Sequence, residues 1–325
     1  MSHILEVKGL TTAFTGDYGT DITVDHVDFY VDRGEVVCIV GESGCGKSVT
    51  SLSIMGLLNR GGAVIDGSVL FDGKNLLGLT EKELDEIRGN RMTMIFQDPL
   101  TSLNPVFTIG SQITESIRIH QKLEKEESRK RAIQILQKVG MPDAEAAMKK
   151  YPHTLSGGMR QRAMIAMALS CQPALIIADE PTTALDVTIQ AQIMKQLQEL
   201  QKELGMAMIL ITHDIGLVAR MADRVYVMYA GQMIEHAQVK DLFLAPKHPY
   251  TKALLATVPG IYDSPERKLA SITGVVPEKY DTIQGCRFAD RCPYMKEKCL
   301  TYEDNEILEN GHEVRCCRVG EWEAS

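Results

Sequence analysis

The chain has 325 residues and a formal net charge of −8, with 44% hydrophobic and 24% charged residues. This length suits one large domain with an appendage, or two domains, and the composition is ordinary for a globular protein. The acidic balance argues against a nucleic-acid-binding surface. The sequence contains no run of about 18 apolar residues, so it predicts no membrane span. The N-terminus lacks the pattern of a signal peptide. We therefore expect a cytosolic chain, in which disulfides are rare, so its eight cysteines need another explanation.

The N-terminal part of the chain predicts a half-exposed antiparallel sheet. Residues 5–8 and 27–32 alternate between apolar and polar side chains, which is typical of strands with one face on a core. Tyr18 lies in the loop between these stretches. It could stack on a nucleotide base or be an ordinary loop tyrosine, and the residues leave both interpretations open.

Residues 41–48, Gly-Glu-Ser-Gly-Cys-Gly-Lys-Ser, match the phosphate-loop pattern G-x-x-x-x-G-K-[S/T] at every fixed position. An apolar run at 35–40 precedes them as a predicted buried strand, and apolar residues at helical spacing follow at 49–58. In this context the backbone N–H groups and the helix N-terminus would bind phosphates. Lys47 would reach the outer phosphates, and the Ser48 hydroxyl would bind Mg²⁺. The strand and the helix disfavour the alternative of a glycine-rich turn that binds nothing.

Polar residues follow three further apolar strands of the predicted core. One strand ends at Gln97, a second delivers Asp179 and Glu180, and a third leads to His213. Ligands bind at the carboxyl ends of parallel strands in such sheets. The two acids suit Mg²⁺ coordination and water activation, with helix capping as the structural alternative.

Helical patterns fill the chain between the strand that ends at Gln97 and the strand that delivers Asp179. Residues 109–151 predict a helical insertion, in which the charged run 122–131 is typical of a solvated face. Ser156 then begins another helix as a plausible N-cap, followed by two glycines that allow close backbone approach. These features predict a second anion-binding helix terminus.

The composition changes near Leu244, where a proline-punctuated linker leads into a tail rich in cysteine. Four thiolates can bind Zn²⁺ or an iron–sulfur cluster. The spacing lacks the short C-x₂₋₄-C pairs usual for zinc, and reduced, unliganded cysteines are the remaining alternative. The tail cysteines are Cys286, Cys292, Cys299, Cys316 and Cys317.

The ordered motifs resemble those of the ATP-binding subunits of ABC transporters, over about residues 4–240. The tail is similar to the C-terminal extension of the dipeptide/oligopeptide importer ATPases, a subgroup that includes nickel importers; the similar residues are 248–251, 285–288 and 291–293. The matching motifs are the Walker A loop (41–48), the Q-loop (Gln97), the signature (155–159, with Met159 where glutamine is commoner), Walker B with the catalytic glutamate (178–180), the D-loop (184–186) and the switch histidine (His213).

This resemblance implies an α/β fold with a RecA-like phosphate-loop core on a mixed and partly parallel sheet. An antiparallel β subdomain, a helical subdomain and a small cysteine-containing C-terminal extension would complete it. The expected nucleotide-binding domain is 1–243, with its helical insertion at about 98–165, and the expected extension is 244–325.

The resemblance also implies an ATPase that drives import of di- or oligopeptides, or alternatively of nickel. Glu180 would polarise the attacking water, His213 would contact the γ-phosphate, and Lys47 would hold the phosphates. Mg²⁺ would be bound by Ser48, Gln97 and Asp179. The resemblance also implies a head-to-tail dimer, in which the signature residues Ser156, Gly157, Gly158 and Met159 contact the nucleotide of the partner. Asp186 belongs to the D-loop. The other residues expected to bind ATP are Tyr18, Gly41, Ser43, Gly44, Cys45, Gly46 and Val49.

The implied partners are two transmembrane permease subunits, a second ATPase subunit that is identical or homologous and, indirectly, an extracytoplasmic substrate-binding protein. No nucleic acid is expected, and the chain would lie at the cytoplasmic face of the cell membrane. A soluble ABC ATPase acting on nucleic acid or ribosomes is the alternative of another class, but such proteins usually carry tandem cassettes or long coiled coils.

For the tail, the resemblance favours a 4Fe–4S cluster on Cys286, Cys292, Cys299 and Cys316. Cys316 is preferred to Cys317 because residues 312–315 resemble the family's approach to its last cysteine.

Overall fold

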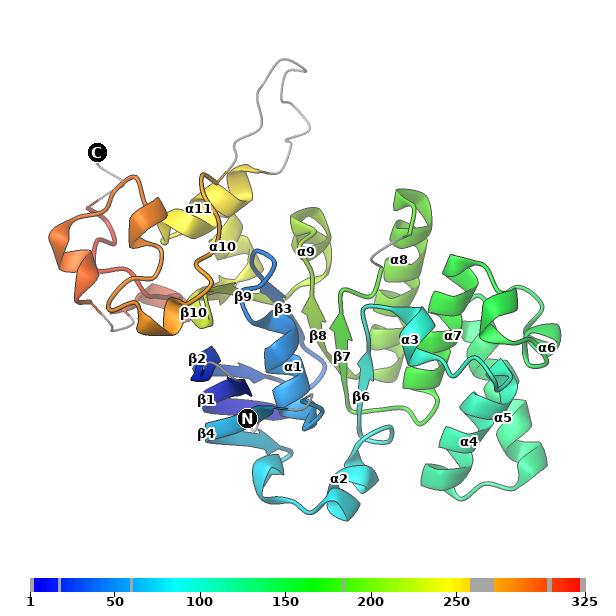
Figure 1. Ribbon diagram of the computed structural model, residues 1–325. Helices are drawn as coiled ribbons and strands as arrows, with labels where there is room; N and C mark the ends of the chain where they lie inside the picture. The colour runs from blue at the N-terminus through cyan, green and yellow to red at the C-terminus, as the bar shows by residue number, and fades with distance from the viewer. Residues whose placement is uncertain are drawn as a thin grey trace. The chain divides into compact units, whose positions relative to one another are not determined.

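The computed structural model describes residues 3–16, 19–58, 61–182, 185–257, 272–302 and 306–321 (Figure 1). The chain forms two compact units. The signature unit comprises Met1–Ile4, Val31–Glu35 and Gly78–Leu210, and the phosphate-loop unit comprises Leu5–Tyr30, Val36–Leu77 and Ile211–Ser325. No helix within the described ranges is long and apolar enough to cross a membrane.

An antiparallel sheet in the phosphate-loop unit confirms the prediction for the N-terminal part of the chain. Its order is β2 (Gly19–Val31), β1 (Leu5–Gly16), β4 (Gly62–Phe71) and β5 (Lys74–Asn75). β1 pairs with β4 from Leu5 opposite Phe71 to Phe14 opposite Gly62. Val27, Phe29 and Val31 are buried, while the residues between them are more exposed, so one face of β2 packs on the core.

The second sheet of this unit contains the strand that leads into the phosphate loop. The order is β11 (Glu306–Ile307), β12 (Glu313–Val314), β10 (Gln232–Gln238), β9 (Arg224–Tyr229) and β3 (Val36–Val40). β3 runs parallel to β9 and both strands are buried along their length, as their continuous apolar residues require. β9 and β10 pair as an antiparallel hairpin, with Gln232 opposite Tyr229. β12 pairs with β10, so the tail extends a sheet of the cassette.

The helices of the phosphate-loop unit include the one that begins at the phosphate loop. They are α1 (Lys47–Met55), α9 (Ile215–Met221), α10 (Val239–Leu244) and α11 (Pro249–Ala256). Short 3₁₀ turns occur at Tyr280–Thr282, Ala289–Arg291, Glu297–Leu300 and Glu309–Gly311, with Leu76–Gly78 at the border between the units.

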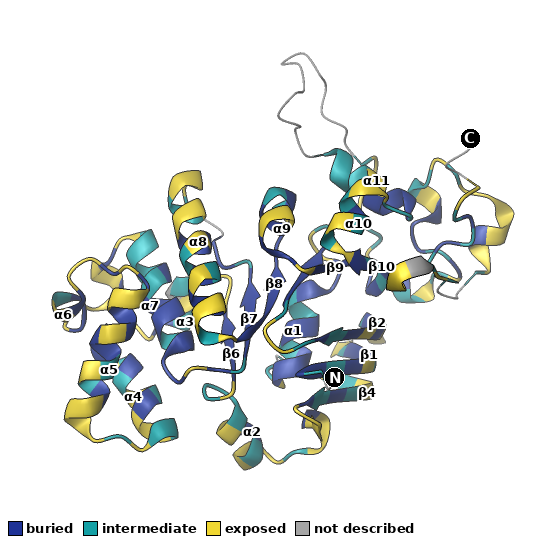
Figure 2. Cartoon of the chain, turned by 180° about the vertical axis from the view of Figure 1, so that it is seen from behind, coloured by how far each residue is buried: buried dark blue, intermediate teal, exposed yellow. Residues whose placement is uncertain are grey.

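The signature unit contains the strands β8 (Ala207–Ile211), β7 (Leu175–Asp179) and β6 (Met92–Ile95), in that order. β6 and β7 are parallel, with Met92 opposite Leu175. Figure 2 shows these strands as buried, whereas α8 has one buried face and one exposed face.

Most helices of the signature unit lie between β6 and β7 in the chain. Thr80 and Glu83 form a capping box that begins α2. On α8, Ile193, Leu197 and Leu200 are buried at helical spacing, so they form an apolar stripe on one face of the helix. The bounds are α2 (Glu81–Ile87), α3 (Pro99–Ser102), α4 (Ile109–Gln121), α5 (Lys125–Lys138), α6 (Ala144–Ala147), the 3₁₀ turn Pro152–Thr154, α7 (Gly157–Leu169) and α8 (Val187–Leu204).

Candidate active site

Two glycines of the phosphate loop occupy positions where a side chain has no room. A Cβ on Gly41 would lie 2.2 Å from the carbonyl oxygen of Met228, and a Cβ on Gly46 would lie 2.8 Å from that of Thr23. Gly46 also has a φ of 105°, in the left-handed region, where it precedes the first residue of α1. The fixed glycines of the motif therefore let the loop pass close to neighbouring backbone before α1 begins.

Lys47 folds back over its own loop. Its Nζ donates hydrogen bonds to the carbonyl oxygens of Gly41 and Glu42, both at 2.8 Å, and the residue is only 6% exposed. The loop is also held from outside, because the N–H of Gly231 donates to the carbonyl oxygen of Cys45 at 2.9 Å. The ammonium group is thus already held against the loop that the sequence predicts to bind phosphates.

The structure brings Gln97 and Glu180 together at the ends of β6 and β7. The Gln97 Nε2 donates a hydrogen bond to Glu180 Oε2 at 2.9 Å. Asp179, the last residue of β7, is 5% exposed. Glu180 has a φ of 44°, a left-handed conformation that costs free energy for a residue with a Cβ. Such strain is typical of functional sites that the surrounding fold holds in place.

The signature residues form the N-terminus of α7. Ser156 is the N-cap, as predicted, and its hydroxyl accepts a hydrogen bond from the N–H of Met159 at 3.4 Å. A Cβ on Gly157 would lie 3.4 Å from Leu185, and one on Gly158 would lie 3.0 Å from Ile189. Gly158 therefore lets this end of α7 pack closely against the start of α8, whereas a Cβ on Gly157 would make only an ordinary van der Waals contact.

Gln161, which no sequence motif singled out, connects this helix to the segment after β7. Its side chain is fully buried and donates a hydrogen bond to the carbonyl oxygen of Pro181, just after Glu180. A glutamine inside an apolar helix face was the available signal, because a buried amide needs a polar partner.

Asp186 and His213 lie just before helices, and two other residues of the predicted motifs lie outside the described ranges. Asp186 caps α8, because its Oδ1 accepts a hydrogen bond from the N–H of Ile189 at 2.9 Å. His213 is exposed and precedes Asp214, the N-cap of α9. Tyr18 and Ala184 lie outside the described residues.

The tail cysteines line one small cavity of about 20 Å³. The sulfur atoms of Cys299 and Cys317 lie 3.6 Å apart. Burial raises the pKa of Cys286 to about 12 and that of Cys316 to about 11, so these thiols are neutral near pH 7. Within the described ranges, no group of three or more His, Cys, Asp and Glu side chains is placed to hold a metal ion. The cysteines lining the cavity are Cys286, Cys292, Cys299, Cys316 and Cys317.

A buried acid, Glu235 on β10, connects the tail to the cassette. Its carboxylate accepts hydrogen bonds from the N–H groups of Lys247, at 2.6 Å, and His248, at 2.8 Å. The His312 Nε2 lies 2.7 Å from the same carboxylate. The Glu235 carboxylate thus binds both the start of the extension, at Lys247 and His248, and a residue near its end, His312. Loss of these contacts would cost free energy, because a buried carboxylate would be left unpaired.

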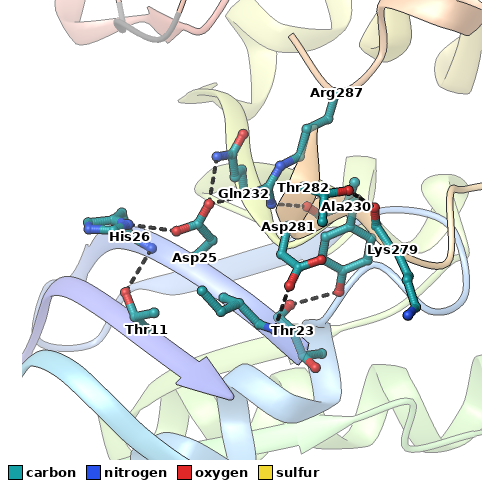
Figure 3. Close-up of polar contacts among 12 residues, drawn as sticks. Thr11, Thr23, Asp25, His26, Ala230, Gln232, Lys279, Asp281, Thr282 and Arg287 are labelled. Atoms are coloured by element: carbon teal, nitrogen blue, oxygen red, sulfur yellow. Dashed lines mark hydrogen bonds and ion pairs between the residues drawn. The ribbon is translucent and has the colours of Figure 1, made fainter. Parts of the chain in front are cut away.

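A second connection holds the extension on the antiparallel sheet, as Figure 3 shows. The Arg287 guanidinium donates to Asp25 on β2 and to the carbonyl oxygen of Ala230. Gln232 donates to the same carboxyl group at 3.0 Å. Burial would raise the pKa of Asp25, but its hydrogen bond with His26 and the charge of Arg287 hold the pKa below its usual value. The extension is therefore tied to the cassette by a charged pair.

The phosphate loop, the paired acids at the end of β7 and the capped signature helix define an ABC-type ATPase. The profile of the family described as "ABC transporter" matches residues 24–183, and that of "Oligopeptide/dipeptide transporter, C-terminal region" matches residues 234–299. The chain belongs to the family of ABC transporter ATP-binding subunits.

Similar proteins cover nearly the whole chain. The oligopeptide transport ATP-binding protein AppD of Bacillus subtilis is 52% identical over 318 residues, which are 97% of each chain. The dipeptide transport ATP-binding protein DppD of Escherichia coli is 50% identical over 314 residues, 96% of each chain.

Solved cassettes share the fold of most of the chain. A dimeric post-hydrolysis state of the ATP-binding cassette MJ0796 bound to ADP and Pi has a TM-score of 0.66 and 28% identity, and covers 72% of this chain and 98% of that one. CbiO1 of Clostridium perfringens, part of the cbiONQ complex, has a TM-score of 0.63 and 33% identity, over 75% of this chain and 92% of that one. Both confirm the predicted α/β cassette fold.

Proposed function

We propose that this chain hydrolyses ATP to drive uptake of di- or oligopeptides through a separate permease. The observation that carries the cargo assignment is the match of residues 234–299 to the oligopeptide/dipeptide C-terminal region. The relatives named as oligopeptide and dipeptide transport proteins support it over nearly the full chain. Nickel is the rival cargo.

The roles proposed for the ATP site follow from the chemistry of its residues. Lys47 and the loop amides hold the phosphates, in the region where the Lys47 ammonium already lies against the loop. Glu180 polarises the attacking water, and its hydrogen bond to Gln97 holds the carboxylate in one orientation. His213 contacts the γ-phosphate. Ser48, Gln97 and Asp179 hold Mg²⁺, which when bound offsets negative charge on the phosphates.

The signature residues are proposed to act on the nucleotide of a second ATPase subunit. Ser156 caps α7 by accepting the N–H of Met159, and the other N–H groups of this first turn can bind an anion. The MJ0796 cassette forms a dimer with bound nucleotide, which supports a dimer here as well. The proposed trans residues are Ser156, Gly157, Gly158 and Met159, with Asp186 nearby in the chain.

A large cavity in the signature unit is the proposed docking surface for the permease. It has a volume of about 760 Å³ and is lined by residues of α4 and α5 and of the segments beside them. Phe107 and Ile119 line it and are more than half exposed, and Arg118, Lys125 and Arg129 add positive charge. Such a patch suits a partner with an apolar and acidic surface. Docking there would hold the chain at the cytoplasmic face of the membrane, with the substrate-binding protein on the other side.

The cysteine cavity is proposed to hold a 4Fe–4S cluster on Cys286, Cys292, Cys299 and Cys316. The gathering of the tail cysteines around one cavity supports a thiolate-bound group, although the cavity is small and the side chains would have to reorient. When bound, the cluster would cross-link the loops of a segment that has little core of its own. Iron and sulfide assays after anaerobic purification test this. Zinc without iron or sulfide would refute the cluster, and Cys316→Ser and Cys317→Ser would identify the fourth ligand by which variant loses iron.

Uptake in cells tests the proposed function. Cells carrying the wild-type chain or Glu180→Gln are offered labelled dipeptide, a longer peptide and nickel separately. Loss of peptide uptake alone in the variant is the expected result. Loss of nickel uptake alone would reject the peptide assignment and keep the importer. No change, although the purified chain hydrolyses ATP, would reject a role in the uptake of any of these substrates.

A further inference from the structure

An arginine of the C-terminal extension binds the phosphate loop directly. The two terminal nitrogens of Arg291 donate to the two carboxylate oxygens of Glu42, at 3.0 and 3.2 Å. Glu42 is the second residue of the loop motif, one of its variable positions. This is the two-pronged geometry that a guanidinium forms with a carboxylate and that a lysine cannot form.

Every hydrogen-bond donor of this guanidinium has an acceptor. Beside the two bonds to Glu42, Arg291 donates to the Tyr229 hydroxyl at 3.2 Å and to the carbonyl oxygens of Thr273 at 2.8 Å and Gly274 at 3.3 Å. These are all five N–H groups that an arginine carries. The side chain is 7% exposed and that of Glu42 is 25% exposed. The pair is therefore a fixed and largely desolvated contact.

The backbone of Glu42 is held from two further directions. Its N–H donates to the hydroxyl of Tyr250, a fully buried residue of α11, at 2.9 Å. Its carbonyl oxygen accepts one of the hydrogen bonds of Lys47. Tyr250 packs with Tyr229 and Phe288 in an aromatic cluster, with ring centroids 4.7 to 5.4 Å apart. The extension thus holds the loop residue whose carbonyl binds Lys47.

We propose that Arg291 is a positioning residue for ATP binding, which acts through Glu42 to hold the phosphate loop in its binding shape. The proposal rests on the proposed function only in that the loop binds ATP. Loss of the pair would let the loop adopt other conformations. The apparent affinity for ATP would then fall in proportion to the fraction of molecules whose loop keeps the binding conformation. The proposed base Glu180 is held by Gln97 and not by this pair, so the kcat at saturating ATP would stay unchanged.

The test uses the full-length purified chain and measures MgATP hydrolysis over a range of ATP concentrations, with the Kd for ATP in the Glu180→Gln background. Arg291→Ala is expected to raise both KM and Kd for ATP roughly tenfold, because a charge-assisted contact is lost. The kcat is expected to stay within about twofold. Arg291→Lys is expected to recover only part of the affinity. Glu42→Gln removes the negative charge and one of the two acceptor oxygens that Arg291 uses, and the double variant with Arg291→Ala is expected to be no worse than the worse single variant.

The matched control is Arg287→Ala, which removes a buried arginine of the same segment that pairs with Asp25 instead of the loop. It is expected to leave the KM for ATP within about twofold. An unchanged KM in both Arg291→Ala and Glu42→Gln would overturn the proposal, as would an equal rise in Arg287→Ala. If Arg291→Ala fails to fold, Glu42→Gln alone decides. A wild-type chain that hydrolyses no ATP would instead reject the proposed function.

Discussion

The side-chain amide of Gln97 donates a hydrogen bond to the Glu180 carboxylate at 2.9 Å, although the two residues are 83 positions apart in the chain. They meet because β6 and β7 are parallel neighbours, so that both strands end at the same edge. The pair joins the Q-loop to the proposed general base. A movement of the segment after Gln97 would therefore displace the Glu180 carboxylate or break this hydrogen bond.

Replacing Glu180 by glutamine should remove activity and leave ATP binding unchanged. A glutamine at this position keeps an oxygen that can accept the hydrogen bond of Gln97, but it cannot take a proton from water. We expect kcat to fall by roughly 10² to 10⁴, the usual contribution of a general base. Single-turnover hydrolysis and ATP binding by the same preparation measure the two effects. Wild-type turnover in this variant would rule out Glu180 as the base.

The left-handed backbone of Glu180 predicts a difference in stability between two inactive variants. Its φ of 44° favours glycine over any residue with a Cβ. Glu180→Gly should therefore be more stable than Glu180→Ala by about 1 kcal/mol, since both lose the contact to Gln97 and differ chiefly in backbone strain. Urea unfolding measures the free-energy difference. If the alanine variant is equally stable, the backbone at this position is not strained.

The motifs predicted much of the local chemistry, because their physics is local. The N-cap Ser156 and the acids at the end of β7 each act within a few residues of their own position. The glycines at 41 and 46 also belong to a local motif, but the backbone that leaves no room for a Cβ there comes from Met228 and Thr23, which the motif does not reveal. The pairing of Arg291 with Glu42 spans 249 residues and follows no periodicity, so no local pattern could reveal it. The same holds for Glu235, a charged residue in a strand that only the folded tail surrounds with donors.

The spacing of the tail cysteines predicts which of them lie close together, but not which of them are ligands. The cysteines were predicted to share one site, and they line one cavity. Both Cys316 and Cys317 reach it, since the chain turns there without a regular strand or helix that would direct adjacent side chains to opposite faces. The choice between them therefore stays a prediction for the iron assay.

Substituting Gly46 by alanine should abolish ATP binding. The new Cβ would lie 2.8 Å from the carbonyl oxygen of Thr23, which also accepts the hydrogen bond of the Tyr280 hydroxyl. Because neither backbone nor φ can adjust cheaply, the loop must shift, and we expect a loss of affinity of at least about tenfold. Gly78→Ala is the control, since no atom lies within 4 Å of its added Cβ. Binding of a fluorescent ATP analogue compares the two variants, and unchanged binding by Gly46→Ala would contradict the close approach.

The half-buried His236 on β10 should make the fold sensitive to mild acid. Burial, together with the charge of Arg224, lowers its pKa from 6.5 to about 4, and its ring stacks on Tyr226 at 4.6 Å. The native state thus keeps this imidazole neutral, while the unfolded chain takes up a proton below pH 6.5. Stability is therefore full above pH 6.5 and is lost as the pH falls toward 4. At pH 5 the loss is about 2 kcal/mol from this residue.

Thermal unfolding at pH 7 and pH 5 measures this loss. The wild-type chain should lose more stability between the two values than His236→Gln, which cannot take up a proton in either state. An equal difference in the wild type and in His236→Gln would show that other groups cause the acid sensitivity.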